Sequence, residues 1–167
     1  MSAAQDLPVL IAGGGIGGLG AALGLARIGR KVLVLEQASR FGEIGAGIQI
    51  GPNAFHSFDA LGVGNEARAK AVYIDSLILM DAIRDERITQ IPLDAPFRQR
   101  FGNPYAVVHR AELHGVLLSA CAASPLVEMR VNAKVVAFDQ DGATVTAMLA
   151  DGSRVTGAAL IGAAGLW

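Results

Sequence analysis

The feature that most constrains this chain is a glycine-rich turn, Gly13-Gly14-Gly15-Ile16-Gly17-Gly18, set between two short aliphatic runs. The first run, Val9-Leu10-Ile11-Ala12, has the continuous apolar character of a buried strand. Residues 19–26 then place apolar side chains at helical spacing, and Gly29 follows as a plausible helix stop. The second run, Val32-Leu33-Val34-Leu35, predicts the next parallel strand. Strand, turn, helix and strand within about 30 residues predict a right-handed βαβ unit.

The same apolar stretch raises the alternatives of a membrane span and a signal peptide. Residues 9–26 carry no charged side chain, which reaches the lower length bound for a spanning helix. Seven of them are glycine, and each glycine is disfavoured in a helix by about 1 kcal/mol relative to alanine. A signal peptide would carry Lys or Arg ahead of the apolar region, where this chain has only Asp6. Both alternatives fit poorly, so we expect no membrane segment.

Charge and cysteine content exclude further classes. The chain of 167 residues has 14 basic and 15 acidic side chains and a net charge of −1, which provides no electrostatic footprint for nucleic acid. Its single cysteine, Cys121, allows no internal disulfide and fits a reducing, cytoplasmic location. The histidines, His56, His109 and His114, show no metal-ligand spacing, so we expect no metal site and ordinary surface or half-buried histidines.

Each part of the glycine turn has a chemical use. Gly13 allows a tight turn off the strand, Gly15 lets the backbone approach a pyrophosphate, and Gly18 lets the helix pack near the strand. The helix N-terminus, which includes Gly17, offers N–H groups and partial positive charge to phosphates. Glu36 lies 23 positions after Gly13 (36 − 13), close to the spacing of the acid that binds a ribose. Its charge would repel a 2′-phosphate, which favours FAD or NAD over NADP.

The resemblance of the next segment to a known family favours FAD over NAD. Residues 36–63 resemble the flavin-dependent aromatic hydroxylases, the single-component class A monooxygenases, which share these motifs: Glu36-Gln37, Gly45-Ala46-Gly47-Ile48-Gln49, Pro52-Asn53-Ala54 and Leu61-Gly62. Residues 101–121 are similar to the same family, in which a short strand ends in His-Arg before a helix. The resemblance implies that Gln37, Gly51 and Arg110 contact the cofactor. It is closest to the 3-hydroxybenzoate 6-hydroxylase and salicylate hydroxylase branch.

The resemblance also implies a reaction. Such an enzyme uses NADH or NADPH to reduce FAD, and a flavin C4a-hydroperoxide then hydroxylates a small aromatic acid such as hydroxybenzoate or salicylate. No catalytic residue is assigned by the motifs. A non-catalytic, truncated nucleotide-binding fragment is the competing hypothesis, and another flavoprotein or an NAD dehydrogenase is a further alternative. Gln49 could orient a substrate or simply support the backbone.

The expected fold is α/β. Residues 1–73 are expected to form the FAD-binding βαβ part of a Rossmann-like domain, with a parallel sheet. Residues 74–100 are expected to begin a substrate-domain sheet with a hairpin. Residues 101–167 are expected to return to the FAD-binding domain and to add a β-meander, because Asp141-Gly142 and Asp151-Gly152 are hairpin signals.

Two departures from the family pattern stand out. Where the family has Gly-Ala-Asp-Gly, this chain reads Gly162-Ala163-Ala164-Gly165, so a carboxylate expected near the cofactor is replaced by a methyl group. The C-terminal half of the family pattern is absent, and we expect a fragment that needs a missing C-terminal half or a homodimer. Cys121 is expected to serve packing, and the Arg98-Gln99-Arg100 cluster is expected to be a solvated loop.

Overall fold

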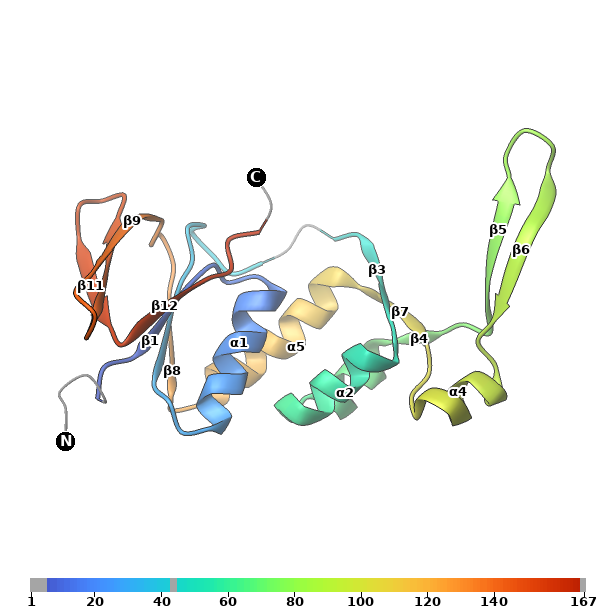
Figure 1. Cartoon of the computed structure of the whole chain (residues 1–167), viewed down its shortest axis with the longest axis horizontal. Helices are drawn as coiled ribbons and strands as arrows, with labels where there is room; N and C mark the ends of the chain where they lie inside the picture. The colour runs from blue at the N-terminus through green and yellow to red at the C-terminus, as the bar shows by residue number, and fades with distance from the viewer. Residues whose placement is uncertain (1–5, 43–44, 166–167) are drawn as a thin grey trace. The chain divides into compact units, whose positions relative to one another are not determined.

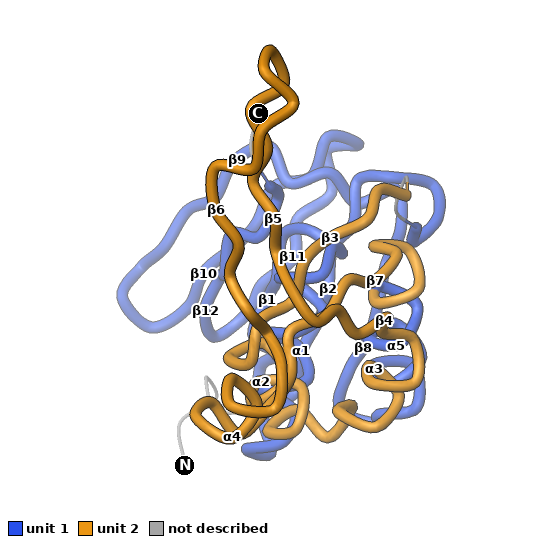
Figure 2. The backbone as a smooth tube through the Cα atoms, turned by 90° about the vertical axis from the view of Figure 1, so that its right-hand side faces the viewer, with its two compact units in different colours: residues 1–44, 114–167 blue, residues 45–113 orange. Residues whose placement is uncertain are grey.

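A computed structural model describes residues 6–42 and 45–165, and Figure 1 labels most of its helices and strands. The chain divides into two compact units, which Figure 2 shows in different colours. The first unit comprises residues 1–44 and 114–167, and the second comprises residues 45–113. The assignment of residues 74–100 to a substrate domain stays a prediction.

A parallel sheet forms the centre of the first unit. Its strands are β1 (Val9–Ala12), β2 (Val32–Leu35), β8 (Val127–Arg130) and β12 (Ala159–Gly162), in the order β12-β1-β2-β8. Leu10 of β1 is in register with Leu33 of β2 and with Leu160 of β12. All four residues of β2 are buried, which explains why its sequence is continuously apolar rather than alternating.

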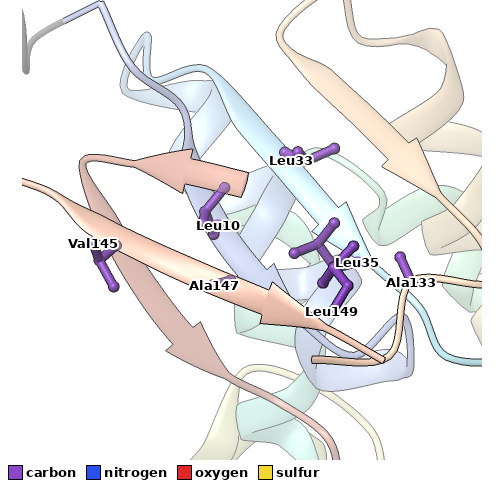
Figure 3. Packing of buried hydrophobic residues seen from close by; sticks show 7 residues of the cluster. All are labelled: Leu10, Leu33, Leu35, Ala133, Val145, Ala147 and Leu149. Atoms are coloured by element: carbon purple, nitrogen blue, oxygen red, sulfur yellow. The ribbon is translucent and has the colours of Figure 1, made fainter. Parts of the chain in front are cut away.

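Helices and a meander cover the sheet. The helix α1 (Ile16–Arg27) joins β1 to β2, and α5 (Arg110–Ala123) runs from the second unit into the first. The antiparallel strands β9 (Val135–Gln140), β10 (Val145–Leu149) and β11 (Arg154–Gly157) form the meander. Figure 3 shows the core between sheet and meander, which contains Leu10, Leu33, Leu35, Ala133, Val145, Ala147 and Leu149. The predicted βαβ unit, meander and return to the parallel sheet are therefore confirmed.

The second unit has a small antiparallel sheet of the strands β3 (Gly47–Ile50), β7 (Ala106–His109) and β4 (Val72–Tyr73), in that order. The helices α2 (Pro52–Leu61) and α3 (Gly64–Lys70) follow β3 in the chain. Pro52 is the first residue of α2, and Gly62 ends it in the left-handed conformation, with φ of 78°; proline and glycine are favoured at these two positions.

A separate hairpin, β5 (Ser76–Asp81) and β6 (Glu86–Pro92), is also part of the second unit. Several of its large apolar side chains are exposed, namely Ile78, Leu79, Met80, Ile83, Ile88 and Ile91. The helix α4 (Ala95–Phe101) follows it and contains Arg98 and Arg100. The expectation of a loop at these arginines was therefore wrong, because Pro96 in the first turn and Gly102 at the end delimit a short helix.

Candidate nucleotide-binding site

The glycine turn lies where the strand order of the parallel sheet reverses. The chain passes from β1 to β2 and β8 on one side, whereas β12 pairs with the opposite edge of β1. Ligands of open α/β sheets bind outside the carboxyl ends of the strands at such a reversal. The residues that follow β1, β2 and β12 are Gly13, Glu36 and Ala163, so these segments end at the same edge.

Close backbone packing explains two of the glycines. Gly13 has φ of 118°, which strongly favours glycine, and a Cβ there would overlap the Ala163 carbonyl that follows β12. A Cβ at Gly18 would overlap the Gly13 carbonyl oxygen and would lie 3.4 Å from Cγ2 of Ile11 on β1. The first turn of α1 therefore packs closely against the end of β1, as the glycine spacing predicts.

The N-terminus of α1 is suited to an anion. Gly15 is the N-cap residue with extended backbone, and no side chain of the described residues caps the helix there. The first turn also contains no acidic side chain. Gly17 is exposed, and a Cβ built on it meets nothing within 4 Å. The backbone N–H groups and the positive end of the helix dipole at this N-terminus therefore favour an anion such as a phosphate.

The carboxylate of Glu36 is held at the turn. Its Oε2 accepts a hydrogen bond of 2.7 Å from the backbone N–H of Gly14, and its Oε1 accepts one of 2.8 Å from Ala38. Each carboxylate oxygen has a second lone pair, so the group can still accept ribose hydroxyls. The structure thus places the Glu36 carboxylate at the glycine turn, and its contact with a ribose stays a prediction. The neighbouring Gln37 is exposed.

The remaining predicted residues belong to the second unit. Arg110 begins α5 directly after β7, and its backbone N–H donates to the carbonyl of Ala46 at 3.0 Å. Antiparallel pairing of β3 with β7 thus brings the Gly45–Gln49 motif to the His109-Arg110 motif. Gly51 is the N-cap residue of α2. Nearby, the Tyr105 hydroxyl donates to Oε1 of Gln49 at 2.7 Å.

One contact of the turn was not anticipated from the sequence. His114 is only 3% exposed, so the expectation of a surface or half-buried histidine was wrong for this residue. Its Nε2 lies 2.8 Å from the carbonyl oxygen of Gly14, although 100 positions separate the two residues. A carbonyl oxygen accepts only, so Nε2 carries the hydrogen. Its place among the apolar residues of a helix offered no signal that it would reach the turn.

Cys121 serves packing, as expected. It is fully buried in α5, and its Sγ lies 3.5 Å from the carbonyl oxygen of Leu19 in α1. Burial raises the pKa of this thiol to about 11. The thiol is therefore protonated at neutral pH and unsuited to nucleophilic chemistry.

A polar network connects the helices of the second unit. Arg68 of α3 donates two hydrogen bonds to the carboxylate of Asp59 in α2, and its Nη2 donates to Oδ1 of Asn103 at 2.8 Å. The Arg68 guanidinium holds the pKa of Asp59 below its ordinary value. The Nδ2 of Asn103 lies 3.3 Å from the ring of His56. His56 therefore has a structural role as a hydrogen-bond partner of Asn103.

Two further properties of the described residues bear on the class of site. Over residues 6–42 and 45–165, no cluster of three or more His, Cys, Asp or Glu side chains could hold a metal ion. None of the helices in this part of the chain combines the length and apolar composition needed to cross a membrane.

Comparisons with known proteins agree with this geometry. The family model described as "FAD binding domain" matches residues 6–167. The 3-hydroxybenzoate 6-hydroxylase 1 of Aquipseudomonas alcaligenes is 55% identical over 159 residues, which are 95% of this chain and 40% of that protein. The 3-hydroxybenzoate 6-hydroxylase of Polaromonas naphthalenivorans is 53% identical, over 96% of this chain and 40% of its own length. The expected similarity to this branch is confirmed, and the chain spans about 40% of these relatives.

Solved structures show the same fold. The p-nitrophenol 4-monooxygenase PnpA from Pseudomonas putida DLL-E4 superposes with a TM-score of 0.86 at 26% identity, over 95% of this chain and 41% of that one. HpxO from Klebsiella pneumoniae, in complex with FAD and uric acid, superposes with a TM-score of 0.78 at 30% identity, over 92% and 38%. Because the family match extends over nearly the whole sequence, the chain belongs to the family of FAD binding domains.

Proposed function

We propose that the glycine turn, the N-terminus of α1 and the carboxylate of Glu36 bind the ADP part of FAD. The observation that carries this proposal is the Glu36 carboxylate, which Gly14 holds at the turn through a hydrogen bond of 2.7 Å. The close packing of Gly13 and Gly18 leaves no room for side chains there, so the backbone can approach a pyrophosphate. The residues present therefore fit the cofactor.

Each predicted residue has a proposed part. Gly13 and Gly18 shape the turn, and Gly15 and Gly17 present backbone at the helix N-terminus to the phosphates. Glu36 accepts the ribose hydroxyls, and the exposed Gln37 borders the adenosine. In the second unit, the guanidinium of Arg110 donates to cofactor oxygens, and Gly51 at the N-cap of α2 allows close backbone approach; these two assignments rest on the family resemblance.

We propose for the complete protein the hydroxylation of a small phenolic acid such as 3-hydroxybenzoate or salicylate, with NADH or NADPH as reductant. The identity of 53–55% to two 3-hydroxybenzoate 6-hydroxylases over nearly the whole chain supports this substrate class. Bound FAD would supply the redox chemistry. Because nicotinamide nucleotides are intracellular reductants, the same proposal places the protein in the cytoplasm.

The β5–β6 hairpin is proposed to begin the substrate-domain sheet. Its apolar side chains, among them Ile78, Leu79 and Ile83, are about half to almost fully exposed, at 54%, 56% and 96%. A patch of this kind marks an interaction surface. We propose that the sequence that relatives possess beyond the length of this chain covers it, with a second copy of the chain as the alternative partner.

A titration of the purified chain with FAD tests the binding proposal. We expect flavin absorbance to co-elute with the protein in gel filtration and ADP to compete with FAD. An ADP analogue with a 2′-phosphate should compete about tenfold less well, because repulsion between the phosphate and the partly buried Glu36 carboxylate costs about 1.4 kcal/mol. Equal competition by both nucleotides would refute the role of Glu36.

A second measurement separates the complete activity from a non-catalytic fragment. The partial span of the relatives favours that alternative for the isolated chain. Anaerobic addition of NADH to the FAD-loaded chain should bleach the flavin absorbance if the chain itself presents the flavin to a nicotinamide. Binding without bleaching would show that the chain is a nucleotide-binding fragment and that reduction needs the remaining sequence.

A further inference from the structure

The buried His114 has no assigned function, yet it contacts the glycine turn directly. Its imidazole is 3% exposed, and its Nε2–H donates to the Gly14 carbonyl at 2.8 Å. Placing an imidazole in an apolar interior is unfavourable unless its polar atoms are paired. The pairing of this histidine is with the turn itself rather than with the body of its own helix.

The hydrogen bond fixes the orientation of one peptide group. In a trans peptide the C=O and the following N–H point in opposite directions. Because His114 holds the Gly14 carbonyl, the N–H of Gly15 must point to the opposite side of the turn. Gly15 is the N-cap residue of α1, and its N–H has no acceptor among the described residues. His114 on α5 therefore orients the Gly15 N–H, which is a donor that the N-terminus of α1 can offer to an anion.

Glu36 fixes the preceding peptide in the same way. Its Oε2 accepts the N–H of Gly14, so both polar groups of Gly14 are bound by side chains from outside the turn. A glycine backbone is otherwise free to populate several conformations. Two side-chain contacts on one residue therefore select a single conformation of the turn before any ligand is present.

We propose that His114 is a positioning residue that orients the Gly14–Gly15 peptide, so that the Gly15 N–H is presented to the pyrophosphate of the dinucleotide. This inference rests on the proposed function of the turn. The role requires a donor at the position of Nε2 rather than an imidazole as such. Glutamine can place an amide N–H2 there, whereas leucine fills a similar volume without a donor.

The first test needs neither a variant nor FAD. In ¹⁵N NMR spectra of the 167-residue chain, we expect the His114 ring to carry a hydrogen on Nε2. Titration with inorganic pyrophosphate should shift the Gly15 amide resonance. An unprotonated Nε2, or a Gly15 amide unaffected by saturating pyrophosphate, would overturn the inference. A chain that responds to pyrophosphate but does not bind FAD would refute the proposed function and leave this inference supported.

The second test compares His114→Leu with His114→Gln. We expect His114→Leu to weaken FAD or pyrophosphate binding by about five- to tenfold, the range for loss of one hydrogen bond, and His114→Gln to stay within about twofold of the parent. Cys121→Ala is the matched control, since Cys121 also contacts a carbonyl of the α1 region from α5. Its ligand affinity should be unchanged. Equal affinities of the Leu variant and the parent, or equal losses in the Leu and Gln variants, would overturn the inference.

Discussion

A methyl group at Gly18 would overlap the carbonyl oxygen of Gly13, and it would lie 3.0 Å from the carbonyl carbon of the same residue. These are backbone atoms, so no side-chain rotation can relieve the overlap, and either α1 or the end of β1 must shift. Overpacking of this kind costs about 1–3 kcal/mol, and the rigid backbone places Gly18→Ala at the upper end. Alanine returns about 1 kcal/mol through its higher helix propensity. We therefore expect a net destabilisation of about 2 kcal/mol.

Thermal unfolding followed by circular dichroism measures this effect. For a chain of this size a loss of about 2 kcal/mol lowers Tm by about 4–8 °C. Gly115→Ala is the matched control, because Gly115 lies within α5 and a Cβ there meets nothing within 4 Å. It makes the same chemical change without an overlap, and should raise the free energy of unfolding by up to about 1 kcal/mol.

The two variants together decide whether close packing explains the glycine at this position. Gly18→Ala should also weaken FAD binding, because the displaced helix N-terminus no longer faces the pyrophosphate at the same distance. A Tm for Gly18→Ala equal to or above that of the parent would refute the reasoning. A parallel loss of stability in Gly115→Ala would show that alanine is unfavourable in these helices for another reason.

Three further outcomes follow from single side chains. Glu36→Gln should weaken FAD binding about tenfold or more in a fluorescence titration, because a neutral amide replaces the carboxylate proposed to accept the ribose hydroxyls, and loss of a charge-assisted hydrogen bond costs about 1.5–3 kcal/mol. Cys121, whose pKa burial raises to about 11, should react with a thiol reagent at pH 8 only after denaturant unfolds the chain; rapid reaction of the folded chain would contradict its burial. Because the pKa of Asp59 is lowered in the folded state, the stability it contributes is present above its ordinary value of 3.8 and lost as pH falls through the folded pKa. The stability difference between the parent and Asp59→Asn, measured by urea unfolding, should therefore shrink from pH 7 to pH 3.

The elements around the turn could be predicted from the sequence because their signals are local. A positive φ at Gly13, a close approach at Gly18 and an acid at the end of the second strand all follow from the requirements of one βαβ unit. The caps of α2 were predictable for the same reason, since proline suits a first turn and glycine suits a left-handed end. Local conformational preference and hydrophobic pattern act over a few residues, and they agree here.

The helix α4 has a weaker local signal. Only Pro96 in its first turn and Gly102 at its end distinguish this seven-residue helix from a charged loop, and short helices depend on such caps.

Contacts between distant segments carry no such signal. The hydrogen bond from Arg68 to Asn103 joins positions 35 apart, and a polar pair at that separation has no sequence pattern. Burial and pairing of these side chains are properties of the tertiary structure alone.

The turn itself shows why a glycine motif does not establish a binding site. Its strand and helix are encoded within residues 9–27, but three contacts from elsewhere determine its conformation: Glu36 from the end of β2, His114 from α5 and the Ala163 carbonyl after β12. A chain with the same motif but without a hydrogen-bond donor at position 114 would form the same βαβ unit, yet the Gly14 carbonyl would lose the contact that orients the Gly14–Gly15 peptide. Affinity for a pyrophosphate depends on the orientation of that peptide. The spacing of the glycines therefore does not identify the residues that complete the motif. The hydrogen bonds that Glu36 and His114 make to the turn identify them.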